Sequence, residues 1–275
     1  MFQHILVPVD GSDRAWAAAR FGAVVADACA ADLEIVHVVA DESHAGEMRS
    51  ELGRSLEEHG LSAANAAIVP IVAPPESDGS AGAAIAAYAE AVDGSMVVMS
   101  STGRGRSAAV LGSVADDVLR SMFGPIIVVG PHVQEIESFS GDLIVPVDGS
   151  DFSEKILPIA GAWGVALGAR PWIVEVITEQ VPTSSDMLES SYPHRLANAL
   201  YAQTHHEVEF EVLHGDSAAA SIASYAGRVD ARLIMMTTHG RTGMKRFTTG
   251  STASSVVHTA TVPVVLYRPP VLALD

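Results

Sequence analysis

The sequence predicts two α/β domains in tandem, each a doubly wound, open parallel sheet of five strands with helices on both faces. Three observations support this prediction. The chain has 275 residues, which is enough for about two domains. Motifs of the first half return in the second half, and each half alternates short apolar runs with helical patterns. Strands that alternate with helices at this spacing form parallel sheets covered by helices.

Composition excludes several classes of protein. Hydrophobic residues make up 48% of the chain and charged residues 18%, which is too apolar for a disordered protein. The net charge of −17 argues against nucleic acid or an anionic membrane as a partner. The single cysteine, Cys29, excludes a disulfide within the chain and a multi-cysteine metal site. Because neither a secretory signal nor a membrane-spanning run is evident, we expect a soluble, cytoplasmic protein.

The chain repeats itself. The motif VPVDGSD occupies residues 7–13 and returns at residues 145–151, at an offset of 145 − 7 = 138. Two further pairs keep the same order, Gly103-Arg104 with Gly240-Arg241 at an offset of 137 and Gly112-Ser113 with Gly250-Ser251 at 138. Three matches in one order predict a tandem duplication. We assign the first copy to residues 1–133, a linker to 134–140, the second copy to 141–268 and a tail to 269–275.

Short runs rich in Val and Ile predict the strands, because parallel strands are buried on both faces. The first copy has such runs at 5–10, 34–39, 66–72, 96–99 and 126–129. The second copy has them at 143–148, 172–177, 208–213, 232–236 and 263–267. A proline normally disfavours a strand, but Pro8 is repeated as Pro146, so the backbone must accommodate it.

Helical periodicity fills the segments between the strands. Three sets of apolar residues each fall on one helical face: Trp16, Ala19, Ala23 and Ala26; Val114, Val118 and Met122; and Ala253, Val256, Val257 and Ala260. The last strands of the two copies are apolar and uncharged, which makes them poor exposed edges. We therefore expect the two copies to pair across these strands within one chain, and two chains to be able to dimerise further.

Ligands of open α/β sheets bind beyond the carboxyl ends of the strands, where the strand order reverses. Asp10-Gly11-Ser12 and Asp148-Gly149-Ser150 follow the first strand of each copy. Glycine-containing loops at 100–113 and 237–251 follow the fourth strands. Glycines let backbone amides approach a ligand, and a Gly-Ser that opens a helix offers N–H groups to an anion such as phosphate. The neighbouring carboxylate suits a ribose hydroxyl or a base amine.

Two common nucleotide motifs do not fit. Neither lysine, Lys155 or Lys245, follows a glycine, so the chain has no P-loop. Gly103 and Gly105 begin a GxGxxG motif, but Ala108 occupies the third glycine position and the motif follows the fourth strand. The chain is therefore neither a P-loop protein nor a Rossmann dehydrogenase.

These motifs resemble the universal stress protein family, specifically its tandem two-domain members, over nearly the whole chain. The family signature is a strand that ends in an aspartate, followed after strand four by G-x₂-G-x₉-G-[ST]. The resemblance implies the family's fold, which is similar to that of adenine nucleotide alpha hydrolases. In ATP-binding members, the aspartate and a valine ending strand two hold the adenosine, and the glycines with the Ser/Thr hold the phosphates.

The resemblance implies one nucleotide site in each copy. The first would comprise Pro8, Val9, Asp10, Val38, Ser100, Gly103, Arg104, Gly112, Ser113 and Val114. The second would comprise Pro146, Val147, Asp148, Val176, Thr237, Gly240, Arg241, Gly250, Ser251 and Thr252. Both depart from the signature, because Ser100 and Thr237 replace its first glycine. Nine residues separate Gly240 from Gly250, as in the family, but only eight separate Gly103 from Gly112, so the first loop is the less regular.

Structural interpretations of the same residues stay open. Asp10 and Asp148 are also typical of a helix N-cap or a turn. The glycine loops are also typical of simple strand-to-helix turns. The basic residues of these loops suit either polyphosphate or solvent. We expect His37 to be buried or hydrogen-bonded, whereas His239 is placed to touch phosphate. His205-His206 lacks a third ligand at metal-binding spacing, so no metal site is predicted.

We predict an ATP-binding regulator of stress or signalling with no dedicated catalysis, whose nucleotide, with or without Mg²⁺, alters contacts with protein partners. Two alternatives stay open: a slow ATP hydrolase, and a nucleotide-free interaction protein of the same fold. No evident base is present to position an attacking water, which disfavours the hydrolase. The retained Asp and Gly-Ser positions disfavour the nucleotide-free protein.

Overall fold

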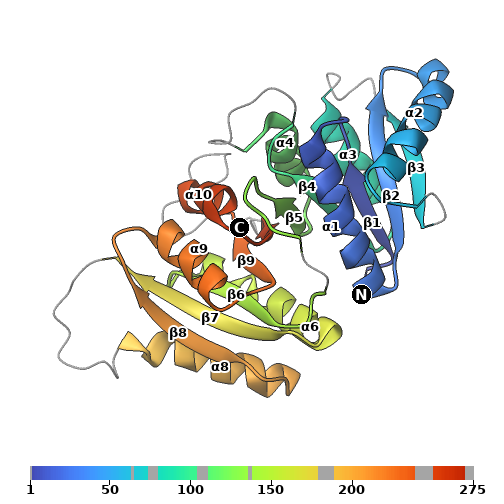
Figure 1. The fold of residues 1–275 in the computed structure, drawn as a ribbon. Coiled ribbons are helices and arrows are strands. Elements are labelled where there is room, and N and C mark those ends of the chain that lie inside the picture. The colour runs from blue at the N-terminus through green and yellow to red at the C-terminus, as the bar shows by residue number, and fades with distance from the viewer. Residues whose placement is uncertain are drawn as a thin grey trace, which may run out of the picture. The chain divides into compact units, whose positions relative to one another are not determined.

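The computed structural model describes residues 2–62, 65–73, 80–103, 111–135, 138–178, 189–238 and 250–269. The chain divides into two compact units, and the boundary between them falls within residues 131–138. Each unit contains an open parallel sheet of five strands with helices packed on it, as predicted (Figure 1). Within the described ranges, no helix has the length and apolar character required to cross a membrane.

The strand order of the first unit reverses at its first strand. The sheet order is β3-β2-β1-β4-β5. Its strands are β1 (His4–Pro8), β2 (Asp32–Val39), β3 (Ala66–Val72), β4 (Ser95–Ser100) and β5 (Ile126–Val129). Its helices are α1 (Asp13–Cys29), the short 3₁₀ helix η1 (Glu42–His44), α2 (Ala45–Glu58), α3 (Ala81–Ala91) and α4 (Ser113–Ser121). The switch point of the sheet therefore lies between β1 and β4.

The second unit repeats this topology. Its sheet order is β10-β9-β6-β7-β8. Its strands are β6 (Asp142–Val147), β7 (Arg170–Ile177), β8 (Glu209–His214), β9 (Leu233–Thr237) and β10 (Val264–Tyr267). Its helices are α5 (Asp151–Glu154), α6 (Leu157–Leu167), α8 (Ser191–Thr204), α9 (Ala218–Arg228) and α10 (Ser251–Thr259). The single helix α1 of the first unit corresponds to α5 and α6 here, because Pro158 favours the first turn of a new helix.

The predicted apolar faces form the cores, with two exceptions. Trp16, Ala19 and Ala26 of α1 are buried, whereas Ala23 on the same predicted face is half-buried. All four predicted core residues that follow Gly250 are buried. Val114 is 37% exposed, so its assignment to a buried face is wrong. It lies in the first turn of α4, at the edge of the sheet where the strands end.

Strand bounds differ from the prediction where backbone pairing decides them. β1 ends at Pro8 rather than residue 10, which leaves Asp10 in the loop. β7 starts at Arg170, two residues earlier than predicted, although Pro171 follows it. The Arg170 N–H donates to the Gly141 carbonyl at 2.8 Å, and its Nε lies 3.0 Å from an Asp142 carboxylate oxygen. These contacts extend the pairing of β6 with β7 past Pro171, although proline normally disfavours a strand.

Pro8 ends the ladder between β1 and β4. Val9 donates its N–H to the Val36 carbonyl of β2 at 2.9 Å. Since successive amides alternate sides along a strand, the nitrogen of Pro8 faces β4, and it carries no hydrogen to donate. Pairing of β1 with β4 covers only residues 4–6 with 95–97. At the switch point of the sheet, β1 and β4 are therefore not paired with each other at their carboxyl ends, although each stays paired with its other neighbour.

Close packing of α1 on β1 requires a glycine. A Cβ at Gly22 would lie 2.5 Å from Cγ2 of the fully buried Val7. We expect Gly22→Ala to lower the free energy of unfolding by about 1–3 kcal/mol through overpacking, as measured by urea denaturation. Gly46→Ala in α2 is the control, because nothing lies within 4 Å of its Cβ position. Equal stability of the two variants would contradict this packing.

Candidate functional site

A cavity of about 310 Å³ opens at the carboxyl ends of β1 and β4 in the first unit. Every described residue that the sequence assigns to the first site lines this cavity, namely Pro8, Val9, Asp10, Val38, Ser100, Gly103, Gly112, Ser113 and Val114. Arg104 lies outside the described residues. The volume is within the range of small-molecule sites. The structure thus brings residues from three strands and one helix start around one hollow.

The Asp10 carboxylate is held in place at the edge of the cavity. Its Oδ1 accepts hydrogen bonds from the Ser12 N–H at 3.0 Å and from the Ser12 hydroxyl at 2.6 Å. Gly11, with φ of +80°, forms the turn between them. The Ser12 hydroxyl in turn accepts the Ala15 N–H at 3.3 Å, so Ser12 rather than Asp10 caps α1. Asp10 is a turn residue whose orientation is fixed by the cap.

Gly103 brings the loop after β4 close to this carboxylate. A Cβ on Gly103 would lie 2.5 Å from Oδ2 of Asp10, which no side chain tolerates without displacing the carboxylate. A Cβ on Gly112 would lie 3.2 Å from the Ser101 carbonyl oxygen. The Gly112 N–H donates to that same carbonyl at 2.7 Å. Gly103 is therefore required by the position of the Asp10 carboxylate, and Gly112 lies in tight contact with the Ser101 carbonyl.

The start of α4 is open to an anion. Gly112 is the N-cap and offers no side chain, so no side-chain hydrogen bond caps the helix within the described residues. The first N–H groups of a helix lack partners in the helix itself, and the helix dipole is positive at this end. Ser113 and Val114 in this turn are exposed. The combination favours a phosphate or another anion.

The second unit closes its loop in the same way. The Gly250 N–H donates to the Thr238 carbonyl at 2.7 Å, and the Thr238 N–H donates to Tyr267 at 2.9 Å. In the first unit, the Ser101 N–H donates to Val129, also at 2.9 Å. The deletion of one residue therefore leaves both ends of the first loop unchanged. Gly240 and Arg241, like His239, lie outside the described residues.

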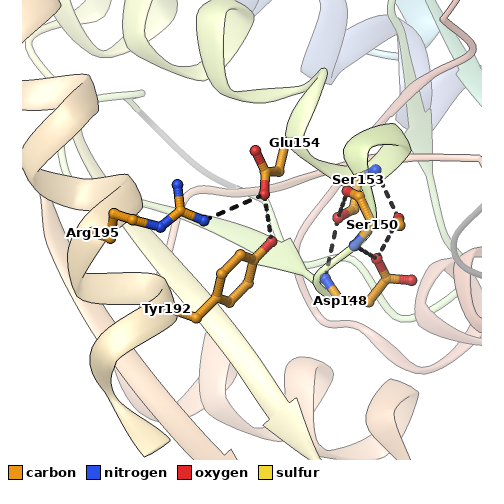
Figure 2. Close-up of polar contacts among 6 residues, drawn as sticks. All are labelled: Asp148, Ser150, Ser153, Glu154, Tyr192 and Arg195. Atoms are coloured by element: carbon orange, nitrogen blue, oxygen red, sulfur yellow. Dashed lines mark hydrogen bonds and ion pairs between the residues drawn. The ribbon is translucent and has the colours of Figure 1, made fainter. Parts of the chain in front are cut away.

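The Asp148 turn matches the Asp10 turn and adds one hydroxyl (Figure 2). Asp148 Oδ1 accepts the Ser150 N–H at 3.1 Å and the Ser150 hydroxyl at 2.6 Å. The hydroxyl of the buried Ser153 accepts the Asp148 N–H at 3.2 Å and donates to the Ser150 carbonyl at 2.9 Å. Ala15 holds the corresponding position in the first unit, so the second turn is bonded more extensively.

The remaining predicted residues of the second site lie on the expected elements. Pro146 and Val147 are buried in β6, and Val176 is half-buried in β7. Thr237 ends β9 and is buried, whereas Ser251 and Thr252 are exposed at the start of α10. Gly250 is the N-cap of α10, again without a side-chain cap among the described residues.

Tyr192 and Glu154 lie beside the Asp148 turn, and the sequence did not indicate them. The Tyr192 hydroxyl donates to Glu154 Oε1 at 3.0 Å, and Arg195 Nη2 lies 3.9 Å from the same oxygen (Figure 2). Burial, and then the Glu154 carboxylate, raise the pKa of Tyr192 well above its ordinary value. No motif links positions so far apart in the chain, so sequence patterns had no means of pairing them.

Three further wall residues of the first cavity carry little sequence signal. The His37 Nδ1–H donates to the Val9 carbonyl at 2.7 Å, which confirms the expectation of a hydrogen-bonded histidine. His37 also lines the cavity. Ala81 and Ile85 of α3 complete the apolar wall, and nothing distinguishes them in sequence from other helix residues.

We expect Glu154→Gln to lower the pKa of Tyr192 toward its ordinary value, because the amide still accepts the hydrogen bond but carries no charge. A near-ultraviolet absorbance titration measures the phenolate. Tyr192→Phe is the control, because it should remove the high-pH step of the titration that we assign to Tyr192. A raised pKa means that the neutral phenol stabilises the fold below about pH 10, and that this contribution is lost at higher pH. An unchanged titration in Glu154→Gln would contradict the assigned role of the carboxylate.

Comparison with known proteins identifies one family. The model of the Universal stress protein family matches residues 1–130 and 141–268. Universal stress proteins of Mycobacterium bovis and Mycobacterium tuberculosis are 29% identical over 185 residues, which is 63% of this chain and 61% of theirs. The match thus spans less than two thirds of the length of these relatives.

Solved structures share the architecture. A universal stress protein from Archaeoglobus fulgidus superimposes with a TM-score of 0.68 at 20% identity, over 97% of this chain and 98% of that one. A putative universal stress protein from Pseudomonas aeruginosa gives 0.63 at 17% identity, over 98% and 94% of the two chains. At these identities the likeness establishes the fold.

Proposed function

Because the chain belongs to the universal stress protein family, we propose that it binds an adenine nucleotide in each unit and acts as a nucleotide-dependent regulator in stress or signalling. The cavity of the first unit is the observation that supports this proposal most directly. It is lined by residues that the family resemblance assigns to the nucleotide, and it lies at the switch point of the sheet.

The two ends of the cavity suit the two ends of a nucleotide. Val9 and Val38 offer apolar surface to a base, and Asp10 Oδ2 offers an acceptor to a ribose hydroxyl. At the other end, the uncapped N–H groups of α4 and the hydroxyl of Ser113 suit phosphate oxygens. Gly103 and Gly112 let the loop pack closely against Asp10 and Ser101, so that its backbone lines this end of the cavity.

We propose an equivalent site in the second unit, around Asp148, Gly250 and Ser251. The matching turn and the matching loop closure support it. Gly240 and Arg241 stay predictions for phosphate contact, and ATP, with or without Mg²⁺, is the nucleotide we propose for both sites. Within the described residues no cluster of three or more metal-ligating side chains occurs, so a magnesium ion would arrive with the nucleotide.

We propose regulation rather than dedicated catalysis. Among the described residues that line the first cavity, Asp10 and His37 are the ionisable ones. Ser12 engages Oδ1 of the aspartate, and the Val9 carbonyl engages Nδ1 of the histidine. Hydrolysis requires a group that positions the attacking water, whereas we assign the Asp10 carboxylate to the ribose. The pairing of the two copies through their last strands and the cytoplasmic location stay predictions.

Gly112→Val and Gly250→Val should each abolish one of two ATP sites. A branched side chain at Gly112 would crowd the Ser101 carbonyl and displace the loop from the helix start, and Gly250 bonds the Thr238 carbonyl in the same way. Asp10→Ala and Asp148→Ala should each weaken one site by about 1–3 kcal/mol through loss of a hydrogen bond to the nucleoside. Calorimetric titration with ATP measures both effects, and circular dichroism confirms folding. Well-folded Gly112→Val/Gly250→Val protein with two sites at wild-type affinity would contradict the site assignment.

Nucleotide analysis of the purified protein distinguishes the proposed regulator from the two alternatives. We expect bound ATP that persists through incubation. Bound ADP with steady turnover of added ATP would favour a hydrolase. Absence of nucleotide, together with no calorimetric response to ATP, would favour an interaction protein that kept the fold alone.

A further inference from the structure

Arg14, in the first turn of α1, lies beside the cavity of the first unit. Its Nη1 donates a hydrogen bond to the Thr102 hydroxyl at 2.6 Å. Thr102 is 1% exposed, lines the cavity and directly precedes Gly103. The Arg14 side chain is itself exposed. The guanidinium therefore reaches across from the β1–α1 turn to the glycine loop that follows β4.

The position is unfavourable for a cation with respect to the helix dipole, and Asp13 in the same turn offsets part of this effect. The first turn of a helix carries the positive end of the helix dipole, where a positive side chain is disfavoured. Within the described ranges, Arg14 forms no ion pair, and its recorded partner is the neutral hydroxyl of Thr102. A guanidinium has five N–H donors, of which this contact uses one. The remaining donors are available to a ligand at the mouth of the cavity.

We propose that Arg14 contacts the phosphates of a nucleotide in the first unit and makes this cavity select nucleoside polyphosphates over nucleosides. This inference rests on the proposed function. The guanidinium is bonded to Thr102, which lines the cavity together with Gly103 and the start of α4, the end that we assign to phosphate. Arginine binds phosphate through paired, charge-assisted hydrogen bonds, which a nucleoside without phosphate cannot accept.

The second unit lacks this arginine. At the offset of 138 that relates the two turns, Arg14 corresponds to Phe152, which carries no charge. Two residues further on, Glu154 places a carboxylate where the first unit has Trp16. Phosphate selection through this corner of the fold is therefore a property of the first unit.

The experiment isolates the first site in full-length Gly250→Val protein and measures ATP and adenosine binding by calorimetry. Arg14→Gln should weaken ATP binding about tenfold and leave adenosine binding unchanged, since it removes a charge-assisted contact worth roughly 1.4 kcal/mol. Arg14→Lys should retain part of the preference. Arg54→Gln is the matched control, because this exposed arginine of α2 bonds only within its own helix at 3.4 Å among the described residues. It should change neither affinity.

Salt dependence gives a second readout that a purely structural role would not move. ATP affinity of the parent should fall more steeply with ionic strength than that of Arg14→Gln. Equal losses for ATP and adenosine, or an unchanged ratio of the two affinities, would overturn the inference while leaving the proposed function intact. Failure of the parent to bind either ligand, repeated with Gly250 intact, would overturn both.

Discussion

One missing amide hydrogen organises the rest of the structure. Position 8 of β1 faces β4, and a proline there cannot extend the ladder, so pairing stops at residues 6 and 97. Past this point, the segments that follow β1 and β4 are no longer hydrogen-bonded to each other. The Asp10 turn and the Gly103 loop are consequently free to face each other across the crevice. Pro146 occupies the same register in β6, whose pairing with β9 covers only residues 143–144 and 233–234.

The site combines local positive potential with a strongly acidic chain. The net charge is −17, and the Asp10 carboxylate lies at one end of the crevice, yet the groups at the proposed phosphate end are N–H donors, hydroxyls and one guanidinium. At physiological ionic strength, charges farther away than about 8 Å are largely screened, whereas donors in contact with a ligand are not. Short-range donors therefore decide whether an anion binds. The acidic remainder is the reason why we predict no nucleic acid partner.

Much of the fold follows from the sequence because burial and duplication leave periodic marks. The apolar runs predict all ten strands that the structure describes, and β3 and β5 begin and end at the predicted residues. The aspartate turns and glycine loops are found from repeated motifs. By contrast, the bond from Arg14 to Thr102 and that from Tyr192 to Glu154 join single positions of distant elements. Such contacts depend on side-chain reach in the folded state and have no period. The exposure of Val114 was not predictable for a similar reason. Helical periodicity shows which residues share a face, but it does not show that the helix starts at a cavity.

The two turns share a backbone frame and differ in the side chains around it: arginine against phenylalanine, tryptophan against glutamate, alanine against serine. After a duplication, the backbone of both turns can stay the same while the side chains around them change. Two sites in one chain can then come to differ in affinity. Two unequal, independent sites fill in succession as ligand rises. Such a chain would register nucleotide over a wider concentration range than a symmetric pair, and it would have a half-filled state with its own surface to present.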